Sequence, residues 1–323
     1  MKAPLLKCTH LCAHFEVKNG TVQAVDDLNF SINRGECIGI VGESGSGKTQ
    51  SCMAILGLLP RNGSATGSAI FRGQEILNTR RKVLDRIRGE SIGMIFQDSM
   101  AGLTPFMRIG DQLCEVLIEH QGMSEAEART RVLEVLDILQ FPQPKRRLRM
   151  YPHELSGGMR QRVMIALALV CKPDLIIADE PTTALDITIQ AQILEFFAGL
   201  KKHTDTAIIM ITHDFGVAAE LCDRVIVMYA GRMVETGSVE DIFARPQHPY
   251  TQALLRATPR LDSDLQADLL LIPGRPPNLQ NIPRGCSFAP RCTQTLEQCR
   301  LERPELGNRF DEHWAACFVR QPQ

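Results

Sequence analysis

The chain has 323 residues, of which 44% are hydrophobic and 23% charged, with a formal net charge of -1. This is the composition of a globular protein with one large core, or one core and a smaller appendage, and its charge gives no reason to expect nucleic acid as a partner. We see no apolar run of about 18 residues, the length of a membrane-spanning helix, and no signal peptide. We therefore expect the protein to stay in the cytosol unless a partner holds it at a membrane.

Strands and helices are expected to alternate along most of the chain, which predicts an α/β fold with a largely parallel sheet. A long helical stretch, about residues 98–158, would then be a helical subdomain inserted into this core. Beyond about Thr258 the texture changes, because six prolines between Pro259 and Pro290 interrupt any long element. The expected strands are 28–32, 36–41, 175–178 and 207–211, the expected helices are 49–59 and 159–170, and an amphipathic helix is expected at 125–139.

A glycine-rich loop follows the second expected strand and fits the pattern G-x-x-x-x-G-K-[ST] in full. Its glycines let consecutive N–H groups face one point, and the helix that follows adds its positive end, so the loop is predicted to hold the phosphates of ATP. Lys48 is expected to reach the β- and γ-phosphates, and the Thr49 hydroxyl to bind Mg²⁺. The loop residues assigned to ATP are Gly42, Ser44, Gly45, Ser46, Gly47, Lys48 and Thr49.

Two carboxylates end the apolar strand at 175–178. Open α/β sheets bind ligands at the carboxyl ends of their strands, so we expect Asp179 and Glu180 beside the phosphate loop. Asp179 would help to hold Mg²⁺, and Glu180 would polarise the water that attacks the γ-phosphate. A solvated acidic pair is the alternative reading, but Pro181 and the sequence after it suit that reading poorly.

A second anion site is predicted at Ser156-Gly157-Gly158, where a capping serine and two glycines precede a long apolar helix. A plain helix cap would have the same composition. Together with the phosphate loop, however, the segment resembles the signature motif of ABC-type ATPases. The glutamine usual at the fifth position of that motif is Met159 here, a change that leaves the serine and glycines in place.

This resemblance implies roles for further residues. Gln97 is similar to the glutamine that senses Mg²⁺ and water and links to the membrane subunit, and it is counted with Glu180 among the catalytic residues. His213 resembles the switch histidine that contacts the γ-phosphate. Asp186 ends a segment similar to the D-loop and is assigned to ATP. Phe15 resembles the aromatic residue that stacks on adenine, although a core phenylalanine is the alternative.

Across nearly the whole chain the sequence is similar to the peptide and nickel uptake branch of ABC ATPases, and most similar to the D-type subunits of oligopeptide permeases. The implied function is ATP hydrolysis that powers oligopeptide import at the cytoplasmic face of a bacterial inner membrane. The implied partners are a second, homologous ATPase subunit, two integral membrane permease subunits and, indirectly, a periplasmic peptide-binding protein. A homodimer, dipeptide or nickel import, or a soluble ABC ATPase of DNA repair or translation are the alternatives. The expected domains are residues 1–257, which bind nucleotide, and the extension 258–323.

Four of the eleven cysteines lie in that extension: Cys286, Cys292, Cys299 and Cys317. In a reducing compartment such a cluster favours a metal site over disulfides. Four thiolates suit zinc or an iron–sulfur cluster, and the spacing fits neither metal's common motifs. Resemblance to the permease ATPases, some of which carry a [4Fe–4S] cluster in this extension, favours iron–sulfur in a structural role. Because the phosphate loop is distant in sequence, we expect ATP binding to survive loss of these cysteines.

Overall fold

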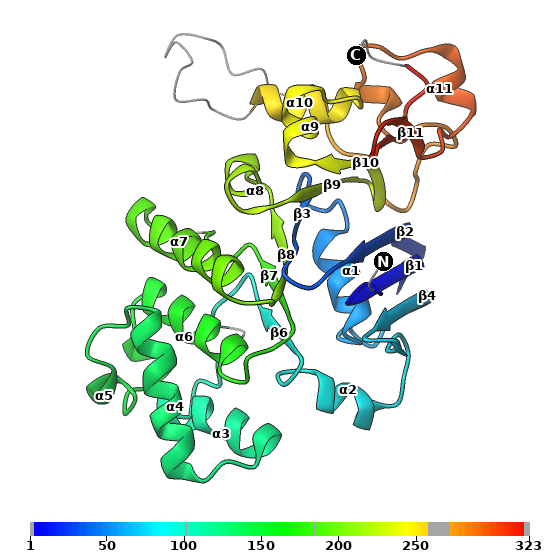
Figure 1. The fold of residues 1–323 in the computed structure, drawn as a ribbon. Coiled ribbons are helices and arrows are strands. Elements are labelled where there is room, and N and C mark those ends of the chain that lie inside the picture. Colours follow the sequence, from blue (N-terminus) through cyan, green and yellow to red (C-terminus); the bar gives the residue numbers. More distant parts are fainter. Residues whose placement is uncertain (1–2, 101, 184, 258–271, 320–323) are drawn as a thin grey trace. The chain divides into compact units, whose positions relative to one another are not determined.

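The computed structural model describes residues 3–100, 102–183, 185–257 and 272–319 (Figure 1). The start of the expected extension, 258–271, and Ala184 of the D-loop lie outside the described residues. The chain forms two compact units, each assembled from separate stretches of sequence. One unit comprises Met1–Ile32, Ile38–Asn78 and Ile211–Gln323, and the other comprises Asn33–Cys37 and Thr79–Met210.

An antiparallel sheet forms the amino-terminal part of the first unit, with the strand order β2-β1-β4-β5. Its first two strands form a hairpin in which Val17 pairs with Gly20, so only two residues make the turn. The hairpin was only partly predicted, since we expected a strand at 28–32 alone. The strands are β1 (Leu6–Val17), β2 (Gly20–Ile32), β4 (Gly63–Phe71) and β5 (Gln74–Glu75).

A second group of strands in this unit has the order β11-β12-β10-β9-β3. The pair β3 and β9 is parallel and buried, whereas the pairs β9–β10, β10–β12 and β11–β12 are antiparallel. The last two strands come from the extension, which we expected to be irregular; pairing with β10 gives it regular structure. The strands are β3 (Cys37–Val41), β9 (Arg224–Tyr229), β10 (Arg232–Ser238), β11 (Gly307–Phe310) and β12 (His313–Ala315).

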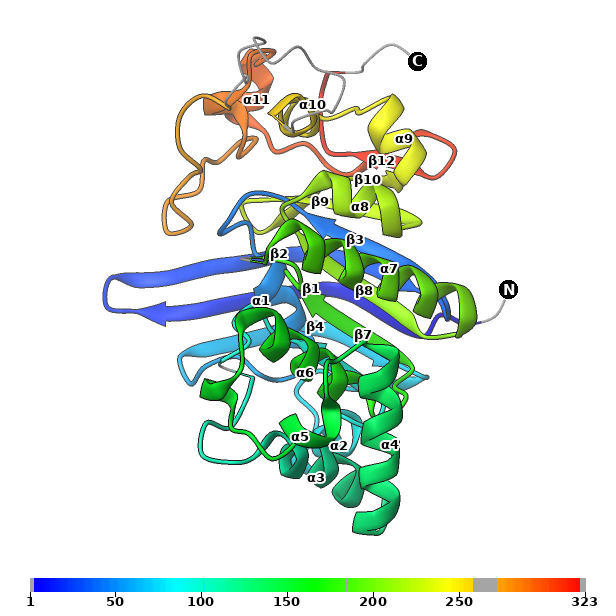
Figure 2. The ribbon, with the colours of Figure 1, turned by 90° about the vertical axis from the view of Figure 1, so that its left-hand side faces the viewer.

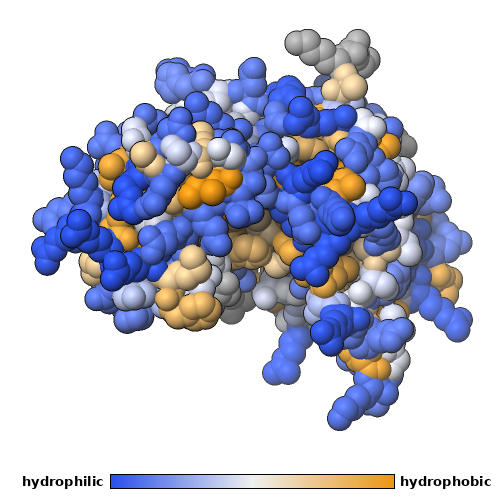
Figure 3. Space-filling model, turned by 90° about the horizontal axis from the view of Figure 1, so that it is seen from below, coloured by the Kyte–Doolittle hydropathy of each residue, from blue (hydrophilic) through white to orange (hydrophobic). Residues whose placement is uncertain are grey.

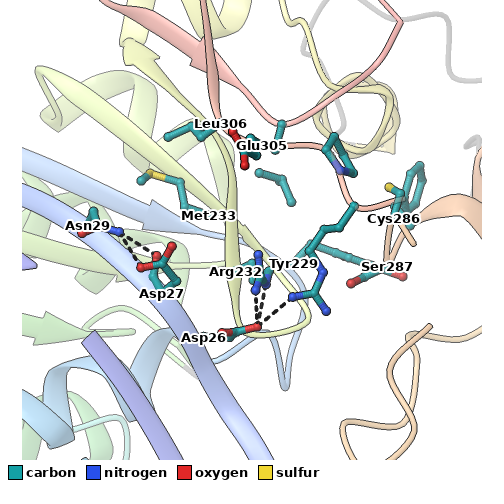
Figure 4. Close-up of a pocket in the computed structure, with 15 residues that line it drawn as sticks. Asp26, Asp27, Asn29, Tyr229, Arg232, Met233, Cys286, Ser287, Glu305 and Leu306 are labelled. Carbon is teal, nitrogen blue, oxygen red and sulfur yellow. Dashed lines mark hydrogen bonds and ion pairs between the residues drawn. The ribbon is translucent and has the colours of Figure 1, made fainter. Parts of the chain in front are cut away.

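Helices of this unit gather around the extension in Figure 2, where α9, α10 and α11 lie close to β10 and β12. Beside them, a cavity of about 470 Å³ is lined by residues of β2, β9 and β10 and of the extension. Asp26 accepts from Arg232 (2.5 Å) and Arg303 (3.2 Å) at this cavity, so a carboxylate of β2 holds the extension (Figure 4). The helices are α1 (Lys48–Ile55), α8 (Phe215–Leu221), α9 (Val239–Ala244), α10 (Pro249–Ala257), η2 (Ala289–Arg291) and α11 (Glu297–Leu301).

The second unit contains the parallel pair β6 and β7, most of β8, and the predicted helical stretch. Ser124 caps α4 in a reciprocal capping box with Glu127, so the helix begins at Glu125 as predicted, and it ends within one residue of the predicted position. The strands are β6 (Ile92–Ile95), β7 (Leu175–Asp179) and β8 (Ala207–Thr212). The helices are α2 (Arg81–Ile87), α3 (Ile109–Gln121), α4 (Glu125–Ile138), α5 (Pro144–Arg147), η1 (Pro152–Glu154), α6 (Gly157–Leu169) and α7 (Ile187–His203).

The surface in Figure 3 is mostly hydrophilic, and its hydrophobic side chains lie in small, separate groups. Among the described helices, none combines the length and the apolar character that crossing a membrane requires. The apolar side chains are instead concentrated in the strands, since β3, β7 and β8 are buried at every position. Such continuous apolar runs are typical of strands covered on both faces.

Candidate functional site

The phosphate loop connects β3 to α1, as predicted. Its backbone needs glycine at two positions. A Cβ on Gly42 would lie 2.2 Å from the Met228 carbonyl oxygen, and a Cβ on Gly47 would lie 2.3 Å from that of Ala24. Gly47 also has a φ of +100°, in the left-handed region where larger residues are strained. The two glycines therefore let the loop pass directly over neighbouring backbone.

Lys48 is the first residue of α1 and is buried. Its ammonium group donates to the carbonyl oxygens of Gly42 (2.8 Å) and Glu43 (3.0 Å), so the side chain folds back along the loop. Ser46 is buried too, and its hydroxyl has no hydrogen-bond partner among the described residues. An unpaired buried hydroxyl beside an ammonium group and a helix amino terminus fits a phosphate oxygen as its missing partner.

Glu180 stands at the end of β7 in the other unit, in a left-handed conformation with a φ of +48°. Two side chains donate to the same carboxylate oxygen, Oε2: the Gln97 amide at 3.0 Å and the Thr183 hydroxyl at 2.9 Å. The structure thus brings together two residues that the sequence assigned to hydrolysis. The contact from Thr183 was not foreseen. Strained backbone that places a carboxylate under two donors is common at catalytic positions.

Asp179 is the last residue of β7 and is 2% exposed. Asp186 caps α7, since its side chain accepts from the backbone N–H of Ile189 at 2.9 Å. Asp179 and Asp186 therefore differ in their surroundings: the Asp179 carboxylate is buried, whereas the Asp186 carboxylate stabilises the amino terminus of α7.

The predicted second anion site lies at the amino terminus of α6, a 13-residue helix. Ser156 is the N-cap, and its hydroxyl accepts from the backbone N–H of Met159 at 3.4 Å. Ser156 and Gly157 are exposed, and a Cβ built on Gly157 would meet no atom within 4 Å. The first N–H groups of the helix are therefore accessible to a ligand from outside this unit.

His213 and Phe15 both belong to the first unit. His213 is exposed and follows β8, directly before Asp214, which caps α8. Phe15 is half-buried in β1, and its ring lies against Gly63 of β4, where a Cβ would approach within 2.9 Å. One face of this ring is thus occupied by the sheet.

The four cysteines of the extension line one small cavity, together with His248 and Phe288. All four are free thiols, and the cavity of about 10 Å³ has room for about one water molecule. Burial, together with the nearby Cys286 and Cys292, raises the pKa of Cys317 to about 11. Burial likewise raises the pKa of Cys286. Among the described residues, no group of three or more His, Cys, Asp or Glu side chains is arranged for a metal ion.

Comparison with known proteins identifies the class. Residues 25–183 match the family described as ABC transporter, and residues 234–299 match the oligopeptide/dipeptide transporter C-terminal region. Among solved structures, the ATP-binding cassette MJ0796, in a dimeric post-hydrolysis state bound to ADP and Pi, aligns with a TM-score of 0.66 and 29% identity, over 72% of this chain and 98% of the cassette. The ABC ATPase fold is therefore confirmed.

The particular branch follows from near full-length relatives. The chain is 55% identical to the oligopeptide transport ATP-binding protein OppD of Salmonella typhimurium, over 97% of this chain and 93% of OppD. It is 53% identical to OppD of Escherichia coli, over 97% of this chain and 93% of that protein. It is 47% identical to the dipeptide transport ATP-binding protein DppD of Bacillus subtilis, over 98% of this chain and 94% of that protein. The chain belongs to the family of ABC transporter ATP-binding proteins of this oligopeptide and dipeptide branch, and it is an ATPase of that class.

Proposed function

We propose that this chain powers oligopeptide import through an inner-membrane ABC transporter by binding and hydrolysing ATP. The observation that carries the proposal is the 53–55% identity to OppD proteins over nearly the whole chain, extension included. These three relatives are all oligopeptide transport proteins, so oligopeptides are the favoured substrate class, although the OppD and DppD proteins of Bacillus subtilis, at 46% and 47% identity, do not separate the two classes. The domain division at residue 257 and the location at the cytoplasmic face of the inner membrane are parts of the same proposal.

In the first unit, the phosphate loop is assigned to the ATP phosphates. The unpaired hydroxyl of Ser46 and the buried ammonium group of Lys48 support this assignment. Lys48 already donates to two loop carbonyl oxygens, and the phosphates of ATP would replace these neutral acceptors with anionic oxygens. Thr49 is assigned to Mg²⁺, His213 to the γ-phosphate and Phe15 to adenine. The free face of the Phe15 ring is the one that would stack on the base.

In the second unit, Glu180 is assigned as the general base. Its carboxylate accepts from Gln97 and Thr183 through one oxygen, Oε2, which holds the other oxygen, Oε1, in a fixed direction toward the attacking water. Positioning of this kind typically accelerates proton transfer by about 10²–10⁴-fold. Asp179 is assigned to Mg²⁺, which bound ATP would bring with it.

The residues of Ser156-Gly157-Gly158 are proposed to bind the ATP of a second ATPase subunit, and Asp186 of the D-loop is also assigned to ATP. Their exposure at a helix amino terminus supports this, because the site is open to a partner. The further partners proposed are two membrane permease subunits, with a periplasmic peptide-binding protein acting through them. A homologous but different subunit is the proposed partner, because the resemblance to the ATPases of peptide permeases implies such a pair; a homodimer is the alternative.

We also propose that Cys286, Cys292, Cys299 and Cys317 hold a [4Fe–4S] cluster. What supports it is the donor set: four thiols around one cavity, whose mutual repulsion as thiolates a cationic metal centre would offset. The cavity is small, so the thiols would move apart to bind four irons. About four irons and four sulfides per chain in protein purified without oxygen would support the proposal, whereas one zinc and no iron would refute it.

The transport proposal is tested by purifying the chain from membranes with its partners. We expect it to copurify with integral membrane subunits, and we expect oligopeptides presented with the binding protein to stimulate ATP hydrolysis. Stimulation by dipeptides or nickel instead would change the substrate class. Recovery without membrane subunits, but with DNA or ribosomes, would favour a soluble ABC ATPase.

A further inference from the structure

A buried arginine of the extension contacts the phosphate loop. Arg291 ends η2, and its guanidinium group donates to both carboxylate oxygens of Glu43, over 2.7 and 2.9 Å. Glu43 is the second residue of the phosphate loop, 248 positions earlier in the chain. The Arg291 side chain is only 5% exposed and that of Glu43 is 25% exposed, so this bidentate ion pair is partly shielded from water and is among the stronger kinds of contact. Both residues belong to the first unit.

The rest of the arginine side chain is held within the same unit. Its Nε–H donates to the Pro273 carbonyl oxygen (2.9 Å), and one terminal nitrogen also donates to the Tyr229 hydroxyl (3.3 Å). The guanidinium carbon lies 6.0 Å from the centre of the Phe288 ring. Hydrogen bonding to Glu43 raises the pKa of Arg291 above its usual value, so the group stays charged. Its position is therefore fixed independently of Glu43.

The backbone of Glu43 is held as well. Its N–H donates to the hydroxyl of Tyr250 (2.8 Å), which is fully buried and packs against Phe288, with 5.3 Å between ring centres. Phe288 in turn lines the cysteine cavity, and Arg291 directly precedes Cys292, which also lines it. A continuous set of contacts thus runs from the cysteines to Glu43. Glu43 also contacts the lysine of the loop, because the Lys48 ammonium group donates to the Glu43 carbonyl oxygen.

We propose that Arg291 is a positioning residue of the phosphate loop, through which the carboxy-terminal extension raises the affinity for nucleotide. The inference rests on the proposed assignment of this loop to the ATP phosphates. Releasing Glu43 would leave a loop that must be ordered when nucleotide binds, which costs affinity. It would also leave the Glu43 carboxylate of the phosphate loop without its Arg291 partner, a negative charge on the loop that is to bind an anion. Our expectation that ATP binding is independent of the cysteine-containing tail is therefore revised.

Linkage makes the effect reciprocal. If an anchored extension strengthens nucleotide binding by a given factor, bound nucleotide must stabilise the anchored extension by the same factor. Amide hydrogen exchange in residues 286–299 should accordingly slow when ATP is added. A purely structural role for Arg291 would stabilise the fold without transmitting this change.

The test measures the dissociation constant of a fluorescent ATP analogue for the full-length chain. We expect Arg291→Ala to weaken binding by about 10-fold, which corresponds to about 1.4 kcal/mol. Arg291→Lys keeps the charge and loses the bidentate geometry, so its affinity for the analogue should lie between those of the original chain and Arg291→Ala. Adding Glu43→Ala to Arg291→Ala should weaken binding no further, because both substitutions remove the same contact between Arg291 and Glu43. The matched control is Arg300→Ala, an exposed arginine of α11, which should bind like the original chain.

Thermal unfolding of each variant establishes that the protein is folded at the binding temperature. If Arg291→Ala unfolds, Arg291→Lys and Glu43→Gln carry the test. The inference would be overturned if the folded variants bind nucleotide within twofold of the original chain, or if the losses of affinity add up in the double variant. It would also be overturned if amide hydrogen exchange in residues 286–299 is the same with and without ATP. Lys48→Ala separates the two proposals. If it retains full affinity, the loop assignment itself is wrong, whatever Arg291 does.

Discussion

Replacing His313 by alanine removes one of three donors to a fully buried carboxylate. Glu235 accepts from the backbone N–H groups of Gln247 (2.6 Å) and His248 (2.9 Å) and is bonded to Nε2 of His313 at 2.7 Å. Both side chains of the Glu235–His313 pair are 0% exposed. The substitution would therefore leave a buried carboxylate with one donor fewer.

The expected destabilisation is about 3 kcal/mol, the low end of the range for breaking a buried pair by removing one partner. Loss of the ring contact between His313 and Phe310, whose ring centres are 4.8 Å apart, contributes to it. For a chain of 323 residues, that lowers the midpoint of thermal unfolding by about 4 °C. His313→Gln keeps a donor near the position of Nε2 and should lose less.

Differential scanning calorimetry measures the midpoint, and hydrogen exchange shows whether β10 and β12 are the strands that open first. The matched control is His10→Ala, which removes another histidine–carboxylate contact, Nδ1 to Asp27 over 2.6 Å, in which the side chains are 75% and 50% exposed. Such exposed pairs contribute about 0–1 kcal/mol. Equal effects of His10→Ala and His313→Ala would refute the reasoning, because burial is its basis.

Three further outcomes follow. Ser156→Arg should lower ATP hydrolysis by the assembled transporter, while the phosphate loop of the same chain keeps its affinity for nucleotide, whereas Lys48→Ala should weaken binding at that loop. Equal losses of this affinity in both variants, measured with a fluorescent nucleotide, would contradict the proposal that Ser156 serves the ATP of a second subunit. Gly47→Ala should abolish nucleotide binding, since its Cβ would lie 2.3 Å from the Ala24 carbonyl oxygen. Gly199→Ala, in α7 with no atom within 4 Å of the new Cβ, should stabilise the protein by about 0.5–1 kcal/mol in denaturant unfolding.

The parts of the site that could be predicted are those whose chemistry lies between chain neighbours. The phosphate loop, the carboxylates after β7 and the N-cap Ser156 each combine a residue type with a strand or helix end within a few positions. Our prediction of the end of α1 was wrong, although the signal that ends this helix is also local in sequence. We extended that helix to 59, but it ends at Ile55, and Gly57 with a φ of +60° follows, a common helix terminator.

Strand β1 was not predicted, because its pattern is irregular. Register shifts after Cys8 and Leu11 break the alternation of buried and exposed side chains that identifies a half-buried strand. Contacts between distant residues could not be predicted either. Nothing near Glu43 in the sequence indicates Arg291, and nothing near Glu235 indicates His313, because the fold alone brings these pairs together.

The central claim, that ATP hydrolysis by this chain powers peptide import, is tested most directly with Glu180→Gln. The amide keeps the oxygen that accepts from Gln97 and Thr183 and removes the charge that polarises water. In a reconstituted transporter that carries the equivalent change in both ATPase subunits, ATP binding should persist, while ATP hydrolysis falls by about 10²–10⁴-fold and ATP-dependent oligopeptide uptake falls with it. Hydrolysis and uptake at the rates of the unaltered transporter would contradict the account.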